Sequence, residues 1–367
     1  MRFWVWLLLG ALMADNLYGQ LVSPEVHADR SVTFRARAPE AKRVLVKGLG
    51  TLPPTAMTKD DQGNWSVTVG PLPADLYSYV LEVDGADQLD IYNRSVKKWL
   101  SLENQVEVPG ERPRLQERAR VPHGAVHWHS YESRTTGGER GVYVYTPPGY
   151  DPRASRTYPV VFLLHGYGDD ESAWTEVGRA HFIVDNLVAA RRIQPLVIVM
   201  PYGHPLTLDR SLPFDNYADR NLLSMEQDVL TDLEPFVRRH YLIADDRQQR
   251  AIVGLSMGGG QSLTIGLNHL DHFSRIGGFS SASPQGPAID QLAAFRDAVA
   301  DTNARIELLW IGCGKEDFLL ERNEAFVQRL RERGVEHEYH LTEGNHSWPV
   351  WRRYLPEFLE KSFPARD

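Results

Sequence analysis

The first third of the chain is dominated by short segments in which apolar and polar residues alternate. Such segments occupy 31–36, 43–47, 65–69 and 77–83, and turns rich in proline and glycine separate them. A period of two is the pattern of β-strands with one buried face. No helical period interrupts the region from Val22 to about Val108, so the pattern predicts a small immunoglobulin-like β-sandwich.

From about residue 125 onward, strand patterns alternate with helix patterns. Val126–Glu132 and Arg140–Thr146 predict a leading antiparallel pair, and the apolar stretch 158–164 predicts a strand buried on both faces. This alternation predicts an α/β fold with a doubly wound sheet, which binds ligands at the carboxyl ends of its strands. Further strands are expected at 196–200, 249–253, 276–280, 306–311 and 336–341, and helices at 182–192, 222–240, 261–270, 288–300, 321–333 and 349–363.

The two patterns divide the chain into an all-β domain at 20–108 and an α/β domain at 125–367. Residues 109–124 between them are charged and contain prolines, which is typical of a linker.

Residues 1–19 have the features of a secretory signal. Arg2 precedes the apolar stretch Phe3–Met13, which is too short to span a bilayer. No later stretch is long and apolar enough for a membrane span. We therefore expect an exported protein, either periplasmic or secreted.

Composition excludes several classes of function. The chain is 42% hydrophobic and 24% charged, as in ordinary globular proteins, and its formal charge of −8 gives no basic footprint for nucleic acid. The single cysteine, Cys313, excludes an intrachain disulfide and is expected to be buried. His127 and His129 share a face of one predicted strand, but no third ligand is near them in sequence, so no metal site is predicted. Oligomeric state is left open.

The stretch 254–260 reads Gly-Leu-Ser-Met-Gly-Gly-Gly and joins a predicted strand to a predicted helix. A serine flanked by glycines at such a junction matches the nucleophile elbow G-x-S-x-G, in which a sharp turn exposes the serine hydroxyl. The pattern therefore predicts Ser256 as a catalytic nucleophile.

A serine needs a base and an acid to attack an ester, and in this architecture they follow it in the order acid, histidine. The loop after the strand 306–311 contains Glu316 and Asp317, and we predict Asp317 as the acid with Glu316 as the reserve. The loop after the last strand contains His346, which we predict as the base.

The predicted strand at 158–164 ends in His165-Gly166-Tyr167, where this architecture supplies an oxyanion-hole amide. We expect the backbone N–H groups of Tyr167 and Met257 to form the oxyanion hole.

The α/β half carries a set of motifs that together resemble the esterase D-like family of α/β-hydrolases. The likeness is greatest to the feruloyl and acetylxylan esterases of carbohydrate esterase family 1. The resemblance implies a Ser256/Asp317/His346 triad that hydrolyses carboxylic esters without metal or cofactor. The motifs lie at 145–150, 158–166, 254–260, 312–317 and 346–351.

The all-β half resembles the early-set domains grouped with family 48 carbohydrate-binding modules. Because the matching residues are mainly turn and core positions, Trp65 and Tyr79 are expected in the core rather than as sugar platforms. The module either binds polysaccharide or braces the catalytic domain. Its occurrence beside cell-wall esterases favours a feruloyl esterase acting on arabinoxylan of the plant cell wall. The matching residues are 34–39, 63–66, 70–73, 77–79 and 83–85.

The loop 202–219 carries four aromatic or imidazole side chains, Tyr202, His204, Phe214 and Tyr217. They either contact a phenolic ring or sugar, or form a packed lid.

Three alternatives remain beside the feruloyl esterase. These are an acetylxylan esterase, an enterochelin-type siderophore esterase and a catalytically inactive carbohydrate-binding protein. An anionic siderophore calls for a pocket lined by Arg and Lys. The acidic composition and the aromatic loop oppose that alternative, and the complete set of triad positions opposes the inactive protein.

Overall fold

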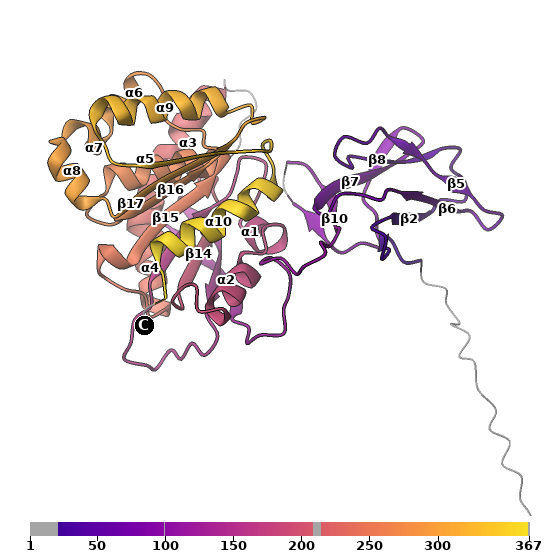
Figure 1. Cartoon of the computed structure of the whole chain (residues 1–367), viewed down its shortest axis with the longest axis horizontal. Helices are drawn as coiled ribbons and strands as arrows, with labels where there is room; N and C mark the ends of the chain where they lie inside the picture. The colour runs from indigo at the N-terminus through magenta and orange to yellow at the C-terminus, as the bar shows by residue number, and fades with distance from the viewer. Residues whose placement is uncertain (1–20, 99, 208–213, 366–367) are drawn as a thin grey trace, which may run out of the picture. The chain divides into compact units, whose positions relative to one another are not determined.

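The computed structural model describes residues 21–98, 100–207 and 214–365 of the protein (Figure 1). The expected signal segment, 1–19, lies outside the described residues. Two compact units are present; the described part of the first comprises 21–73 and 79–94, and that of the second comprises 74–78 and the residues from 95 onward. In the part of the chain that the structure describes, no helix has the length and apolar character that a membrane span needs.

The region from residue 25 to 107 is all-β, as the alternating pattern predicted. One sheet has the strand order β1-β2-β6-β5, and the other has the order β4-β3-β7-β10-β9 with β8 beside β7. The strands are β1 (Glu25–Val26), β2 (Val32–Arg37), β3 (Val44–Lys47), β4 (Thr55–Ala56), β5 (Thr58–Lys59), β6 (Asn64–Val69), β7 (Leu76–Val83), β8 (Ala86–Gln88), β9 (Val96–Lys97) and β10 (Glu103–Glu107).

Aromatic side chains form the centre of the first unit. The rings of Phe34 and Tyr79 lie 4.7 Å apart in an edge-to-face arrangement, and both side chains are buried. Trp65 is also buried, and its indole N–H donates to the carbonyl of Ala38. Trp65 and Tyr79 are therefore core residues, as expected from their place on alternating strands.

The second unit is built on an eight-stranded sheet with the order β11-β12-β14-β13-β15-β16-β17-β18. Both β11–β12 and β12–β14 pair antiparallel, and every pair from β14–β13 to β17–β18 is parallel. The α/β sheet predicted from the sequence is thus confirmed. The strands are β11 (Ala125–Ser133), β12 (Gly138–Thr146), β13 (Val160–Leu164), β14 (Val197–Pro201), β15 (Arg250–Leu255), β16 (Arg275–Phe279), β17 (Leu308–Gly314) and β18 (Glu338–Thr342).

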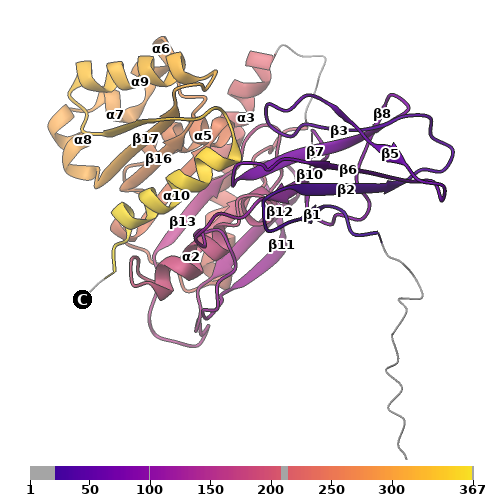
Figure 2. The same ribbon diagram turned by 45° about the vertical axis from the view of Figure 1, so that its right-hand side comes forward.

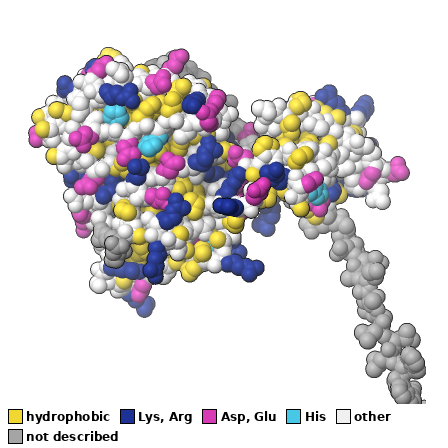
Figure 3. Space-filling view, in the orientation of Figure 1, with side chains coloured by type: hydrophobic (Ala, Val, Ile, Leu, Met, Phe, Trp, Pro, Cys, Tyr) yellow, Lys and Arg dark blue, Asp and Glu magenta, His cyan; other side chains and the backbone are white. Residues whose placement is uncertain are grey.

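Helices cover both faces of this sheet (Figure 2). Val160, Phe162 and Leu164 of β13 point to one core, whereas Val161 and Leu163 point to the other, because side chains alternate across a strand. Helices α3 (Phe214–Asp228), α4 (Glu234–His240), α5 (Ser256–Asn268) and α9 (Leu320–Arg333) pack on the first core, and α1 (Ala173–Glu176), α2 (Ala180–Ala189) and α10 (Trp348–Ser362) pack on the second. On the face that Figure 3 shows, basic and acidic side chains of this unit are interspersed.

Three helix predictions were wrong in their bounds. The helix expected at 261–270 begins five residues earlier, at Ser256. The helix expected at 288–300 is three short helices, α6 (Pro287–Gln291), α7 (Ala293–Arg296) and α8 (Val299–Arg305), with extended backbone at Leu292 and Ala298. The carboxamide of Asn268 accepts from the amide of Ala293, so a tertiary contact caps α7 where the pattern predicted continuation. The helix expected at 222–240 begins at Phe214, and a π-helical turn, Val229–Leu233, separates α3 from α4.

Candidate active site

Ser256 lies at a tight turn between β15 and α5. Its φ of 52° is in the left-handed region, which a residue with a side chain rarely adopts. A Cβ at Gly254 would collide with the carbonyl of Gly258, and a Cβ at Gly258 would lie 2.5 Å from the carbonyl oxygen of His165. Both glycines are therefore required by close backbone approach, and the turn has the geometry expected of a nucleophile elbow.

His346 joins Ser256 to Asp317. The Nε2 atom of His346 lies 3.0 Å from Oγ of Ser256, and its Nδ1 atom lies 3.0 and 2.9 Å from the carboxylate oxygens of Asp317. Asp317 follows β17 and His346 follows β18, so neighbouring parallel strands deliver them to the same edge of the sheet. The structure brings together the three side chains that the sequence predicted.

The carboxyl group of Asp317 is held ionised in a buried position. Burial alone would raise its pKa, but hydrogen bonding, chiefly from His346 and with a contribution from the amide of Leu319 at 2.8 Å, lowers the pKa below the ordinary value. An ionised acceptor fixes the proton of His346 on Nδ1, which leaves Nε2 to accept the proton of Ser256.

The two loops that carry Asp317 and His346 are bonded to each other. The amide of Lys315 donates to the carbonyl of Thr342 at 2.8 Å, and the amide of Glu316 donates to that of Gly344 at 3.2 Å. The carboxylate of Glu316, the reserve acid, accepts from the amide of Gly344 at 2.6 Å. Glu316 therefore supports the loop of His346, while Asp317 is the carboxylate that contacts the imidazole.

Tyr167 and Met257, the predicted oxyanion residues, lie on two segments close to Ser256 and line the same pocket. Met257 is in the first turn of α5, and Tyr167 is in the loop after β13. This loop runs close to the nucleophile, because a Cβ built at Gly166 would lie 3.4 Å from Cβ of Ser256.

The side chain of His165 holds the same loop in place through two hydrogen bonds. Its Nε2 atom accepts from the amide of Gly203 at 2.7 Å, and its Nδ1 atom donates to the carbonyl of Gly166 at 2.8 Å. The side chain is fully buried, and burial lowers its pKa to about 4. A neutral imidazole protonated on Nδ1 is the form that makes both bonds. The sequence contained this histidine in the predicted oxyanion motif but gave no indication of its partners.

The four side chains of the aromatic loop have different surroundings. His204 is buried; its Nδ1 atom lies 2.6 Å from the hydroxyl of Tyr217, and its Nε2 atom lies 3.0 Å from the carbonyl oxygen of Tyr167. The ring of Tyr202 stacks on His165 with centroids 5.9 Å apart. Phe214 begins α3, and its side chain is outside the part that the structure describes.

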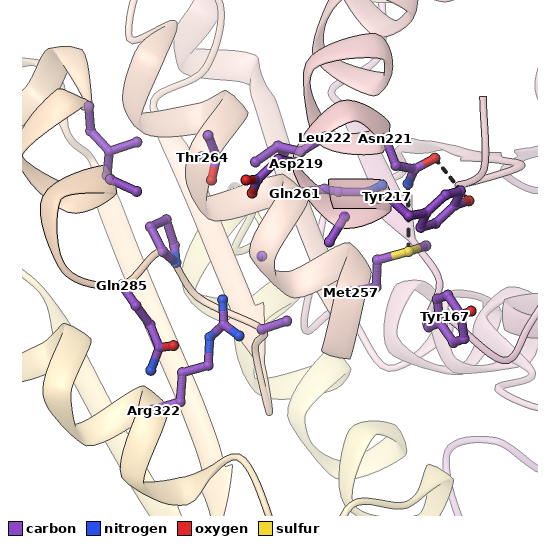
Figure 4. A pocket seen from close by; sticks show the side chains of 16 residues that line it. Tyr167, Tyr217, Asp219, Asn221, Leu222, Met257, Gln261, Thr264, Gln285 and Arg322 are labelled. Carbon is purple, nitrogen blue, oxygen red and sulfur yellow. Dashed lines mark hydrogen bonds between the residues drawn. The ribbon is translucent and has the colours of Figure 1, made fainter. Parts of the chain in front are cut away.

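A pocket of about 440 Å³ opens beside Met257 and Tyr167 (Figure 4). Of the four aromatic and imidazole side chains predicted in the loop 202–219, Tyr217 is the one found among the described residues that line the pocket. Its polar lining comes from side chains for which the sequence gave no functional signal, since they carry no motif and are assembled by packing of α3, α5, α9 and the loop after β16. They are Asp219, Asn221, Gln261, Thr264, Gln285 and Arg322.

Two amide side chains hold the wall of this pocket in place. Asn221 and Gln261 each donate to the carbonyl of Gly203 at 3.0 Å, and Asn221 also lies 3.7 Å from the sulfur of Met257 (Figure 4). The loop that contains Gly203 is thereby tied to α3 and α5. It is tied to β13 through His165.

The other candidate residues lie outside this arrangement. Cys313 is buried in β17, and burial raises the pKa of its thiol to about 12, so it stays protonated. The rings of His127 and His129 stack with centroids 6.3 Å apart, and Nε2 of His129 lies 2.5 Å from the hydroxyl of Tyr241. Among the described residues, no cluster of three His, Cys, Asp or Glu side chains is arranged to hold a metal ion.

Comparison with solved structures places the fold. A ferulic acid esterase matches with a TM-score of 0.56 and 27% identity over 66% of this chain and 98% of its own. The enterobactin esterase of Shigella flexneri matches with a TM-score of 0.64 and 18% identity over 90% of this chain and 92% of its own. Both likenesses support the α/β-hydrolase fold.

Sequence relatives lead to the same family. An endo-1,4-beta-xylanase/feruloyl esterase of Xylanibacter ruminicola is 29% identical over 347 residues, which is 93% of this chain but only 46% of that protein. The chain thus spans about half the length of this relative. The Esterase family model ("Putative esterase") matches residues 133–361, which is more than half of the chain. The match contains Ser256, Asp317 and His346, and because it covers more than half of the chain, the chain belongs to the Esterase family.

Proposed function

We propose that the protein is a serine carboxylic-ester hydrolase that works through an acyl-enzyme. The observation that carries the proposal is the hydrogen-bonded series Asp317–His346–Ser256, with the serine at a left-handed turn. His346 takes the proton of Ser256 as Oγ attacks the ester carbonyl, and then gives it to the leaving alcohol. Water then attacks the acyl-enzyme; His346 takes a proton from the water and gives it to Oγ of Ser256 as the carboxylic acid leaves.

The amides of Tyr167 and Met257 are proposed to stabilise the tetrahedral oxyanion. Both segments are close to Ser256, and His165 bonds the loop of Tyr167 to the amide of Gly203. A backbone donor aimed at the developing charge contributes about 2.7–4 kcal/mol to transition-state stabilisation.

The acyl group is proposed to be a hydroxycinnamate such as ferulate. A pocket of about 440 Å³ is lined by Met257, the residue after Ser256, and it is within the range of sites for small organic ligands and much larger than an acetyl group requires. Its lining joins apolar residues, such as Leu222, with hydroxyl and amide groups, such as those of Tyr217 and Gln285. The feruloyl esterase relative supports the same choice.

A siderophore esterase is the second candidate because the enterobactin esterase aligns over most of the chain. Charge opposes it. Among the described residues that line the pocket, Arg322 is the one basic residue and Asp219 the one acidic residue, so the lining carries no net positive charge. A tri-catecholate–iron complex is strongly anionic and favours a basic lining.

The site of action is proposed to be the plant cell wall, reached by export through the segment 1–19. The all-β unit is proposed to have a structural role rather than to bind sugar, since Trp65 and Tyr79 are core residues. Incubating a full-length variant with both Ser256→Ala and Phe318→Ala, an exposed residue beside His346, with insoluble xylan tests this point. Retention on the xylan that soluble xylan competes away would contradict the structural role.

Initial rates on methyl ferulate, feruloylated arabinoxylan, acetylated xylan and ferric enterobactin test the substrate. We expect the feruloyl esters to give the highest kcat/KM, whereas a higher value for either other substrate overturns the hydroxycinnamate assignment. Ser256→Ala is expected to abolish turnover while its unfolding curve matches the wild type. Ser130→Ala, an exposed serine on β11, is the matched control and should retain full activity.

A further inference from the structure

Phe318 is an exposed aromatic residue in contact with the base. Its ring centroid lies 4.4 Å from that of His346, at an interplanar angle of 49°. The side chain is 76% exposed, so it contributes little to the core. On another side of His346 lies Trp351, with centroids 5.0 Å apart, and Trp351 is buried. The imidazole therefore has one aromatic neighbour inside the protein and one at its surface.

The loop that presents Phe318 is firmly held. Its neighbour Asp317 is bonded to His346 and accepts from the amide of Leu319 at 2.8 Å. The preceding residue, Glu316, is bonded through its amide and its carboxylate to Gly344. The exposed ring is thus attached to a well-held loop beside the reacting atoms. This favours binding because the loop loses less conformational entropy when a ligand binds.

When an ester reacts with Ser256, its acyl group and its alcohol extend from the reacting carbon in different directions. The leaving oxygen must come within hydrogen-bonding reach of Nε2 of His346, because that atom returns the proton to it. Phe318 contacts this imidazole, whereas neither Phe318 nor His346 is among the residues that line the pocket beside Tyr167 and Met257. Since the leaving alcohol must reach His346, we assign the alcohol half to the side of Phe318 and the acyl half to the pocket.

We propose that Phe318 is the binding platform for the leaving alcohol, and that this alcohol is a sugar unit of a polysaccharide. The proposal rests on the ester hydrolysis proposed above. A pocket of about 440 Å³ does not hold a polymer, so the polymer must lie on the open surface, where Phe318 is exposed. The C–H face of a sugar ring packs on an aromatic ring, and a hydroxyl of the same sugar carries the ester.

A substrate comparison tests the platform. Phe318→Ala is assayed on methyl ferulate, whose alcohol is methanol, and on a feruloylated arabinoxylan oligosaccharide. The loss of kcat/KM on the oligosaccharide is expected to exceed the loss on methyl ferulate by roughly three- to tenfold, the worth of one aromatic stacking contact. Phe318→Tyr should restore the ratio. Leu341→Ala, another exposed apolar residue, on β18, should leave the ratio at the wild-type value.

Binding provides a readout that needs no turnover. In the Ser256→Ala background, calorimetry with the de-esterified oligosaccharide is expected to show binding that Phe318→Ala weakens by the same factor. Equal losses on both esters would mean that Phe318 acts on His346 itself, and that result, or unchanged sugar binding, overturns the platform. If the wild type hydrolyses no ester yet binds the sugar through Phe318, the proposed function fails and the platform stands.

Discussion

Both carboxylate oxygens of Asp317 lie within hydrogen-bonding distance of Nδ1 of His346, at 3.0 and 2.9 Å. Because Asp317 is buried and also accepts from the amide of Leu319, it can hold the imidazole in one orientation and one tautomer. The reactivity of Ser256 is therefore expected to depend on a residue that does not contact it directly.

Replacing Asp317 by Asn separates charge from shape at this contact. The amide can present an N–H to Nδ1, which favours the wrong tautomer, and kcat on methyl ferulate is expected to fall by about 10⁴-fold. Glu316→Gln is the matched control in the same loop, since Glu316 bonds the amide of Gly344 instead. It should keep kcat within a few-fold of the wild type. Equal losses in the two variants would refute the assignment of the acid.

Gly258→Ala tests the packing of the elbow. The added methyl would lie 2.5 Å from the carbonyl oxygen of His165 and 2.7 Å from backbone atoms of Leu164, and backbone cannot move aside cheaply. We expect the free energy of unfolding to fall by about 1–3 kcal/mol, as for other overpacked sites. Gly138→Ala meets no atom within 4 Å and should change it by less than about 0.5 kcal/mol. Denaturant titration of both variants makes the comparison.

Asp228→Ala tests a buried ion pair behind the aromatic loop. Asp228 is fully buried and bonds Arg140 at 3.1 Å and the hydroxyl of Tyr131 at 2.6 Å, and Arg140 in turn donates to the carbonyl of Tyr202. Removing the carboxylate leaves the buried guanidinium of Arg140 without this ion-pair partner. The free energy of unfolding is therefore expected to fall by about 3–5 kcal/mol. Asp290→Ala breaks an exposed pair with Arg329 and should cost about 1 kcal/mol or less. Thermal or urea unfolding measures the loss of stability in both variants, and similar losses would contradict the expected difference between the buried and the exposed ion pair.

The sequence was sufficient for the parts of the site that local pattern determines. The strand-then-loop positions of Ser256, Asp317 and His346 follow from periodicity and chain order, and the three side chains are bonded in that order. Their catalytic roles stay predictions. Asp317 was predicted with Glu316 in reserve because both are acids in one loop. Their tertiary contacts distinguish them, since Asp317 contacts His346 and Glu316 bonds the amide of Gly344.

Residues that come together only through tertiary packing could not be predicted from the sequence. Arg322 on α9 and Gln285 after β16 meet at the pocket although neither belongs to a motif, and helix periodicity does not say which polar face will adjoin a ligand site. The same holds for the break between α6 and α7, where the cap of Ala293 comes from Asn268, 25 residues earlier. Long-range side-chain contacts are what single-sequence patterns leave undetermined.

His165 makes the stability of the protein depend on pH. In the unfolded chain its imidazole takes up a proton near pH 6.5, whereas burial lowers its pKa to about 4 in the folded protein. Between these values the unfolded state binds more protons, so stability falls as the pH is lowered from 6.5 towards 4. Linkage over this window gives a loss of about 2 kcal/mol between pH 7 and pH 5 from this residue alone.

The variant His165→Gln cannot titrate and should lose about 2 kcal/mol less than the wild type between those pH values. His181, whose burial also lowers its pKa to about 4, is present in both proteins and cancels from the difference. Urea unfolding of the two proteins at pH 7 and pH 5 measures it. The difference in free energy of unfolding between the two proteins should be large at pH 7, where the neutral imidazole bonds Gly203 and Gly166. The difference should be smaller at pH 5. A difference that does not change with pH would mean that folding leaves the pKa of His165 near 6.5. The imidazole of the folded protein would then be protonated at pH 5 and could not accept from the Gly203 amide.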